Sequence, residues 1–499
     1  MDAVETLSAN LTKANMGVVA HYYMDVELQG VLTAVREEQS RTTTAAQSRI
    51  AIADSLAMGD HAVKMCEDGA TTIACLGVDF MSESVATIMA RNGYGHIPVY
   101  RLNPNPIGCS LAESAERDSY RAWLEKEGSN PSSRALHVIY INTSLETKAV
   151  SASIVPTITC TSSNVLNTIL QASAQIPDLK IMYGPDTYMG TNLVTMLDTI
   201  LSHGAGEGSA AAADGAEPWD DARIARDLHP LHTAASLRSL RDSLDVYPSG
   251  MCVVHEMFGS EVVRAVREKY ADAYVTAHLE VPGEMFEIAM EKSLTDKGTV
   301  GSTSDILKFI SRKVKKATEE KKAVGVSGSE EKRKLQFILG TEAGMVTSIV
   351  KSVQDILTST GNASVEAEII FPVSSEAVMG VDEGEGGAAS TDLKVVPGSA
   401  GGEGCSTAGG CATCPFMKMN DLDALNDVAD LVLRAQTSGV GSPDRMKLVT
   451  YLPPNRLQGK MIGNILAVDL GSEPILFMRQ FMQEKAIPEE LVRKITAVA

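Results

Sequence analysis

The sequence predicts an α/β protein made of three similar three-layer αβα domains arranged around a pseudo-threefold axis. Apolar, β-rich runs alternate with helical patterns along the chain, which is typical of parallel sheets covered by helices. The same succession of strand, hydroxyl-bearing turn, helix, strand and helix also occurs three times. A chain of 499 residues is long enough for several such domains.

Each copy begins with an apolar strand that ends in polar side chains. The three strands are MGVVAHYY, ALHVIYIN and DAYVTAHLE. Because ligands of parallel sheets bind beyond the carboxyl ends of the strands, these side chains are candidate site residues. They are His21, Tyr22 and Tyr23, then Tyr140 and Asn142, then His278 and Glu280.

A turn rich in serine and threonine follows in each copy and opens a helical pattern. The turns contain Ser55, Ser163 and Thr303. One such turn is commonly a helix cap, but the same groups bind phosphates and carboxylates. Three turns at matching places favour an anion-lined pocket if the copies face a common axis. A later strand in each copy ends in glycine and an acid, and these acids are Asp79, Asp186 and Glu342.

These patterns give the expected domain boundaries. Residues 1–108, 109–251 and 252–379 are the three α/β domains, and 204–217 is an insertion in the second. Glycine and serine enrichment over 380–410 predicts a flexible linker. Residues 411–499 form a C-terminal segment with closing helices.

The eight cysteines are spread along the chain, which favours a reducing compartment over a disulfide scaffold. Cys66 and Cys75 lie in apolar segments and are expected in the core. Cys109, Cys252 and Cys414 each follow one of the copies, so a threefold arrangement would bring three thiolates together. Three thiolates fit an iron–sulfur cluster that has one iron without a protein ligand. Such an iron can act as a Lewis acid.

Other uses of the C-x-x-C motif at Cys411 and Cys414 stay open. A structural zinc site commonly needs two such motifs, and a redox pair is expected near an early strand–helix unit.

The net charge of −19 and the lack of a basic patch argue against nucleic-acid binding. No run of about 20 apolar residues predicts a membrane span. The start MDAVETLSAN is unlike a secretory signal or an Arg-rich transit peptide.

Many stretches together resemble the quinolinate synthase family of NAD biosynthesis, and the plant and algal type most. They include AHYYMDVELQ, IADSLAM, GCSLAES, VIYINTSLETKA, CTSSNV, YGPDTYMGTNL, CVVHEMFGSEVV, FILGTEAGMVTSIV and GCATCPFMKMN, from about residue 15 to 425. The added N-terminal sulfur-transfer activator domain of plant members has no counterpart in this sequence. Many bacterial members have H-P-E-C where this chain has His278 to Val281.

The resemblance implies a 4Fe–4S cluster held by Cys109, Cys252 and Cys414, with His255 close to it. It implies that iminoaspartate and dihydroxyacetone phosphate condense to quinolinate, phosphate and water. The residues expected in catalysis are Tyr23, Tyr140, His278 and Glu280. The residues expected to bind substrate are His21, Ser55, Tyr140, Asn142, Ser163, His278, Glu280 and Thr303.

The resemblance also implies partners and a place in the cell. L-aspartate oxidase or dehydrogenase would supply iminoaspartate, and cysteine desulfurase with sulfur-transfer proteins would assemble the cluster. A homodimer, no nucleic-acid or membrane partner, and a cytoplasmic or plastid-stromal location are expected. Some members form a disulfide between the last two cysteines, which here would join Cys411 to Cys414. Two other hypotheses are a diphthamide-synthesis-type iron–sulfur enzyme, which would need S-adenosylmethionine, and a non-catalytic iron–sulfur or zinc protein.

Overall fold

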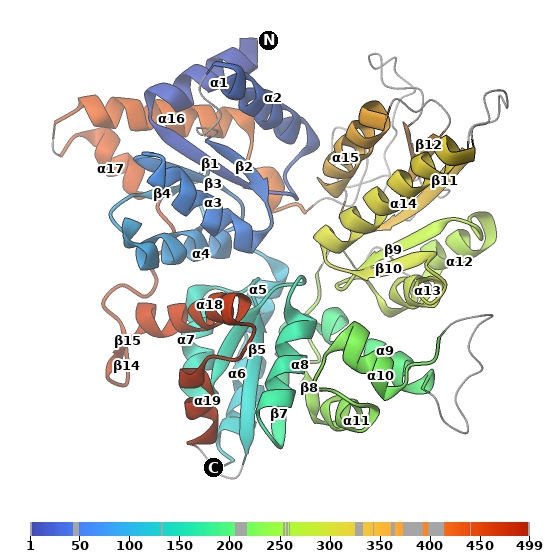
Figure 1. Ribbon diagram of the computed structural model, residues 1–499. Coiled ribbons are helices and arrows are strands. Elements are labelled where there is room, and N and C mark those ends of the chain that lie inside the picture. Colours follow the sequence, from blue (N-terminus) through green and yellow to red (C-terminus); the bar gives the residue numbers. More distant parts are fainter. Residues whose placement is uncertain are drawn as a thin grey trace. The chain divides into compact units, whose positions relative to one another are not determined.

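The computed structural model of the chain, drawn in Figure 1, divides into two compact units. The first unit contains Met1–Pro131, Ile139–Thr161 and Cys414–Gln483, and the second contains Ser132–Val138, Ser162–Thr413 and Glu484–Ala499. The structure describes all residues except 1, 43–48, 131–132, 205–216, 253–254, 256–257, 259, 325–332, 343, 361–364, 373–392, 398–413, 440 and 498–499.

The first sheet has four parallel strands in the order β2-β1-β3-β4. The strands are β1 (Met16–His21), β2 (Ile50–Ala53), β3 (Thr72–Leu76) and β4 (Val99–Arg101). The helices are α1 (Asp2–Lys13), α2 (Val26–Thr42), α3 (Ser55–Glu67) and α4 (Asp79–Met89). β1 and β3 are buried along their whole length, as expected of central strands covered on both faces. In Figure 1, α1 and α2 cover one face, and α3 and α4 cover the other.

The second sheet has the strand order β6-β5-β7-β8. Its strands are β5 (Arg134–Tyr140), β6 (Thr157–Cys160), β7 (Leu179–Gly184) and β8 (Leu244–Val246). The helices of this part of the chain are α5 (Ser110–Ala115), α6 (Asp118–Gly128), α7 (Leu145–Ile154), α8 (Val165–Gln175), α9 (Thr187–Ser202), α10 (Asp221–Arg223) and α11 (Ala234–Ser243). The expected insertion at 204–217 lies almost wholly outside the described residues.

The third sheet has five parallel strands in the order β10-β9-β11-β12-β13. Its strands are β9 (Tyr274–His278), β10 (Gly298–Gly301), β11 (Arg333–Gly340), β12 (Val365–Phe371) and β13 (Leu393–Pro397). The helices are α12 (Ser260–Lys269), α13 (Gly283–Ser293), α14 (Thr303–Val324) and α15 (Gly344–Thr360). β13 lies inside the segment expected to be a linker, and the rest of that segment is outside the described residues.

The three sheets repeat one topology. In each, the first strand of the copy lies second in the sheet, between the second and third strands, and the fourth strand follows the third. The copies begin at β1, β5 and β9, which are the three strands that end in polar side chains. This confirms the prediction of repeated αβα domains.

The C-terminal segment contributes its first two helices to the first sheet's core. It contains α16 (Leu422–Thr437), α17 (Pro443–Val449), the short strands β14 (Met461–Ile462) and β15 (Ile465–Leu466), and α18 (Ala467–Glu484), before α19 (Glu489–Thr496). The apolar face of α16, including Leu425 and Val432, is buried in the same core cluster as Met16 and Val18 of β1. Burial of that face against the β1 sheet explains why a segment so distant in sequence returns there. Among the described helices, none combines the length and apolarity that a membrane crossing needs.

Candidate functional site

Polar side chains stand at the carboxyl ends of the three first strands. His21, Tyr140 and His278 are the last residues of β1, β5 and β9, and Tyr23, Asn142 and Glu280 follow two residues later. His21 Nδ1 accepts a hydrogen bond from the Tyr23 amide (3.2 Å), and His278 Nδ1 accepts one from the Glu280 amide (3.3 Å). The first and third copies therefore share the same local turn.

The predicted hydroxyl residues lie at, or directly before, the starts of three helices. Ser55 is the first residue of α3, but Asp54 is the cap, with Oδ1 accepting hydrogen bonds from Leu56 N and Ala57 N. Ser163 precedes the cap of α8, which is Asn164. Thr303 is the first residue of α14. These positions place the hydroxyls beside helix N-termini, where anions bind favourably.

The acids that follow the third strand of each copy occupy equivalent places but different environments. Asp79 opens α4 and is paired with Arg101, Nη1 to Oδ1 2.7 Å. Asp186 caps α9 and is fully buried. Burial raises the pKa of Asp186, and the negative charge of Glu280 raises that pKa further. Glu342, which follows β11, is also fully buried.

In the first unit, two of the three predicted cluster ligands lie on neighbouring loops. A Cβ placed on Gly108 would be 3.4 Å from the ring of Phe416, so the segments that carry Cys109 and Cys414 touch. Asn420 holds the second segment at the end of β3, since its side chain accepts from Gly77 N (3.3 Å) and donates to Gly77 O (3.2 Å). Both cysteines are partly exposed and pack against the core of the first sheet.

The loop that leads to Cys109 is held from the same strand end. The amide of Asp79 donates to Ile107 O (3.0 Å). Buried Arg101 donates to the carbonyls of Pro104, Asn105, Thr450 and Leu452, at 3.1 to 3.4 Å. This guanidinium therefore joins Asp79, the loop before Cys109 and the C-terminal segment. Sequence reasoning missed Arg101, whose only signal was its place at the end of a predicted strand.

In the second unit, buried polar side chains lie close to Cys252. One ligand atom from each of Cys252, His255 and Glu280 lies within 4.8 Å of the others, so these residues could hold a metal ion. His255 Nδ1 is 2.9 Å from Glu280 Oε2, and the His255 and His278 rings stack with centroids 5.3 Å apart. His255, His278 and Glu280 are nearly inaccessible to solvent.

The protonation state of His278 is set by its burial and by the charges of its neighbours. Burial lowers the pKa of His278 to about 4, the carboxylate of Glu280 acts to raise that pKa, and His255 lowers it. The imidazole is therefore neutral near pH 7. A neutral imidazole can donate one hydrogen bond and accept another, which suits proton transfer.

The remaining described cysteines are of a different kind. Cys66, Cys75 and Cys160 are buried, the first two as predicted. Burial raises the pKa of the Cys66 thiol to about 11 and that of Cys75 to about 12. Such thiols are poor metal ligands at neutral pH. Cys405 and Cys411 lie outside the described residues.

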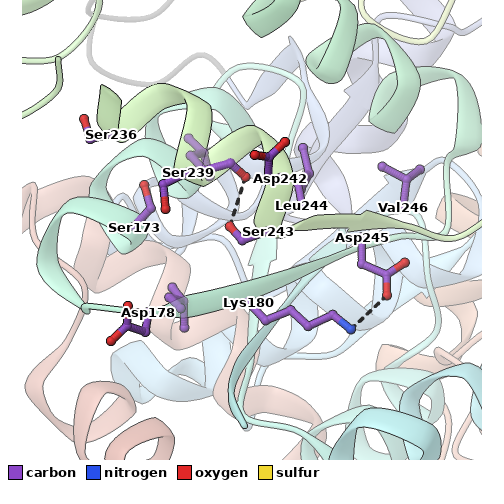
Figure 2. Close-up of a pocket in the computed structure, with 12 residues that line it drawn as sticks. Ser173, Asp178, Lys180, Ser236, Ser239, Asp242, Ser243, Leu244, Asp245 and Val246 are labelled. Atoms are coloured by element: carbon purple, nitrogen blue, oxygen red, sulfur yellow. Dashed lines mark hydrogen bonds and ion pairs between the residues drawn. The ribbon is translucent and has the colours of Figure 1, made fainter. Parts of the chain in front are cut away.

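A separate cavity of about 590 Å³ in the second unit contains none of the predicted site residues. Figure 2 shows its serine-rich wall and the ion pair of Lys180 with Asp245, at 3.3 Å. Its lining mixes that pair with further acids, so it offers no concentration of positive charge for an anionic ligand. It is lined by Ser173, Asp178, Leu179, Lys180, Ser236, Ser239, Leu240, Asp242, Ser243, Leu244, Asp245 and Val246.

Comparison with known proteins gives the family. A family model described as "Quinolinate synthetase A protein" matches residues 5–367, which is most of the chain. The chain belongs to the quinolinate synthetase A family. It is 44% identical to "Quinolinate synthase, chloroplastic" of Nicotiana tabacum over 497 residues. It is likewise 44% identical to the chloroplastic quinolinate synthase of Arabidopsis thaliana over 496 residues.

The share of each chain that is aligned differs between the plant relatives and a more distant member of the quinolinate synthetase A family. Both plant alignments cover 99% of this chain but 62% of the relative, so the chain spans about three fifths of their length. The quinolinate synthase of Sulfurisphaera tokodaii is 26% identical over 291 residues, which are 58% of this chain and 65% of that protein.

Proposed function

We propose that this chain is a quinolinate synthase that condenses iminoaspartate with dihydroxyacetone phosphate to quinolinate, phosphate and water. The observation that carries the proposal is the 44% identity to plant quinolinate synthases over 99% of the chain. The strand-end residues support it, because two anionic substrates need hydroxyls, helix N-termini and imidazoles around them.

The proposed cofactor is a 4Fe–4S cluster held by Cys109, Cys252 and Cys414. The donor set fits, since these three thiols are partly exposed and lie on loops, unlike the core thiols of Cys66 and Cys75. When bound through three thiolates, a cluster retains one iron without a protein ligand, which supplies a Lewis acid for a substrate oxygen.

The protein's own groups would bind and move protons. The hydroxyls of Ser55, Ser163 and Thr303 would hold carboxylate and phosphate oxygens at the helix N-termini. Glu280 would move a proton during the ene-diol stage, and neutral His278 beside it would donate a hydrogen bond to an intermediate oxygen. His21 and Asn142 would complete the substrate contacts, with Tyr23 and Tyr140 as acid–base groups.

The proposal extends to the chain's surroundings. L-aspartate oxidase or dehydrogenase would supply the iminoaspartate, and cysteine desulfurase with sulfur-transfer proteins would supply the cluster sulfide. A plastid-stromal or cytoplasmic location and a homodimer complete it; the plastid alternative draws on the word "chloroplastic" in the relatives' names.

An anaerobic experiment tests this function. Protein purified without oxygen is analysed for iron, zinc and sulfide, then supplied with dihydroxyacetone phosphate and with iminoaspartate generated in place from aspartate. We expect quinolinate, detected by chromatography, and near-complete loss of both the brown chromophore and product in Cys109→Ser, Cys252→Ser and Cys414→Ser. Cys66→Ala is the matched control and retains both. Zinc in place of iron, or cluster-loaded protein that yields no quinolinate, would refute the proposal.

A further inference from the structure

The turn after β1 is held by one buried side chain. Gln29 Nε2, from α2, donates to the carbonyls of Tyr22 and Met24, both at 2.8 Å. Gln29 is almost completely buried. The two carbonyls lie directly before and after Tyr23, so the amide group tethers the backbone on both sides of that residue.

The turn after β5 is held in the same way by a different chemical group. Lys148 Nζ, from α7, donates to the carbonyls of Ile141 (3.1 Å) and Thr143 (2.5 Å), which lie on either side of Asn142. Its third hydrogen bond goes to Thr143 Oγ1, at 2.9 Å. All three protons of the ammonium are therefore used on one turn.

The turn after β9 repeats the contact a third time. Asn192 Nδ2 donates to the carbonyls of Leu279 (2.9 Å) and Val281 (2.7 Å), on either side of Glu280. Asn192 is fully buried, like the donors in the other two copies. In all three copies the tethered residue is the one two positions after the end of the first strand.

The source of the donor differs between the copies. Gln29 lies eight positions after His21, the last residue of β1, and Lys148 lies eight positions after Tyr140, the last residue of β5. The equivalent position in the third copy, 278 to 286, is Phe286, a buried side chain without a donor. Asn192 supplies the contact instead, from α9 of the preceding copy. The two-carbonyl contact is thus present in all three copies even where its usual donor is lost.

A donor that bonds two carbonyls in this way restrains the orientation of the backbone of the turn as well as its position. Each buried donor that pairs two carbonyls sets the orientation of the peptide units on both sides of one residue. A buried carbonyl left without a donor is unfavourable, so the turn has little freedom to rotate. The Cα–Cβ direction of the enclosed residue is fixed as a result.

We propose that Gln29, Lys148 and Asn192 are positioning residues that set the directions of Tyr23, Asn142 and Glu280 for substrate. This inference rests on the proposed function. Displacement of a reacting or binding group by about 1 Å can cost on the order of 100-fold in rate. The donor nitrogen of each side chain bonds two backbone carbonyls of its turn, and Lys148 Nζ also bonds a threonine hydroxyl. Through these contacts the three residues act on the residues that they enclose.

The test removes the donors while keeping side-chain volume. Gln29→Leu, Lys148→Met and Asn192→Leu are each expected to lower kcat about 10- to 100-fold with a smaller change in KM and an unchanged iron content. Amide hydrogen exchange should accelerate at the turn of the altered copy and not at the other two. Gln39→Leu is the matched control, because Gln39 is a buried glutamine of the same helix as Gln29. It should alter neither kcat nor exchange at 22–24.

One variant needs a companion. Glu83 Oε2 accepts from Leu145 N (2.7 Å), and Lys148 and Glu83 interact electrostatically. Lys148→Met alone leaves the buried Glu83 carboxylate without its neighbouring cation, which could itself destabilise the fold. The double variant Lys148→Met with Glu83→Gln removes that charge and so distinguishes loss of the tether from loss of folding.

The outcomes separate the two proposals. Wild-type protein with no quinolinate activity overturns the function, while hydrogen exchange still decides whether the turns are tethered. Unchanged kcat and unchanged exchange in all three variants overturn the inference. A fall in kcat that only follows the folded fraction assigns the donors a purely structural role and also overturns it.

Discussion

Arg101 Nη1 lies 2.7 Å from Asp79 Oδ1, and 7% and 15% of the two side chains are exposed. The same guanidinium donates to carbonyls of the loop before Cys109 and of residues 450 and 452. This ion pair therefore joins the end of β3, a proposed cluster loop and the C-terminal segment. In the second and third copies the equivalent acids, Asp186 and Glu342, are fully buried.

Breaking this pair should destabilise the first unit. Arg101→Met leaves Asp79 nearly buried without its cation, and we expect a loss of about 3–5 kcal/mol of unfolding free energy, measured with urea. Arg101→Met combined with Asp79→Asn should cost clearly less than the sum of the single variants. Additive losses would show that the pair itself contributes little.

Asn420 should control cluster loading more than folding. Asn420→Leu removes both hydrogen bonds to Gly77 and frees the segment that carries Cys414. We expect iron content to fall several-fold while stability falls by about 1–3 kcal/mol. Asn426→Leu on the nearby α16 is the control and should load iron normally, because Asn426 bonds Asn10 and Leu422. Equal iron content in the two variants would contradict this role.

Gly250 should be intolerant of any side chain. Its backbone approaches Pro185 so closely that a Cβ would overlap the Pro185 carbonyl oxygen, and it exchanges two hydrogen bonds with Thr187. Gly250→Ala must shift the segment that leads to Cys252, and we expect a loss of about 1–3 kcal/mol and reduced iron binding. Gly30→Ala in α2 has open space around it and should instead stabilise by about 0.5–1 kcal/mol. The thermal unfolding midpoints of both variants check this.

His137 should make stability depend on pH below neutrality. It is fully buried on β5, and burial lowers its pKa from 6.5 to about 3. Between these values the unfolded chain binds the proton and the folded chain does not, so stability is lost as pH falls. The slope of this contribution approaches about 1.4 kcal/mol per pH unit. His137→Gln should remove that part of the dependence, and the difference between its urea stability profile and that of wild type should be flat above pH 7. A constant difference between pH 4 and 7 would contradict the assignment.

Much of the repeat could be predicted from the chain alone. The strands that end at His21, Tyr140 and His278 are local apolar runs, and their polar ends are visible as sequence. Helix starts at Ser55 and Thr303 follow from capping chemistry, which acts within a few residues. Such features can be recognised without knowledge of the fold, because each depends only on residues that are close together in the sequence.

Contacts between distant segments could not be predicted. The sequence shows nothing that would pair Asn420 with Gly77, 343 positions away, or place Asn192 rather than Phe286 against the turn at Glu280. The linker prediction over 380–410 also missed β13, because that strand is recognisable chiefly by its pairing with β12. Amide and lysine side chains in helices look like surface positions until the carbonyls that they bind are known.

The sequence by itself determined the three-copy α/β architecture and the chemical groups at the strand ends, because both arise from short-range pattern. Only the tertiary structure decided which buried donors hold those groups and which loops lie beside Cys109. The reason is that a buried hydrogen bond depends on where packing brings two segments, and packing of a long chain is a property of the whole core.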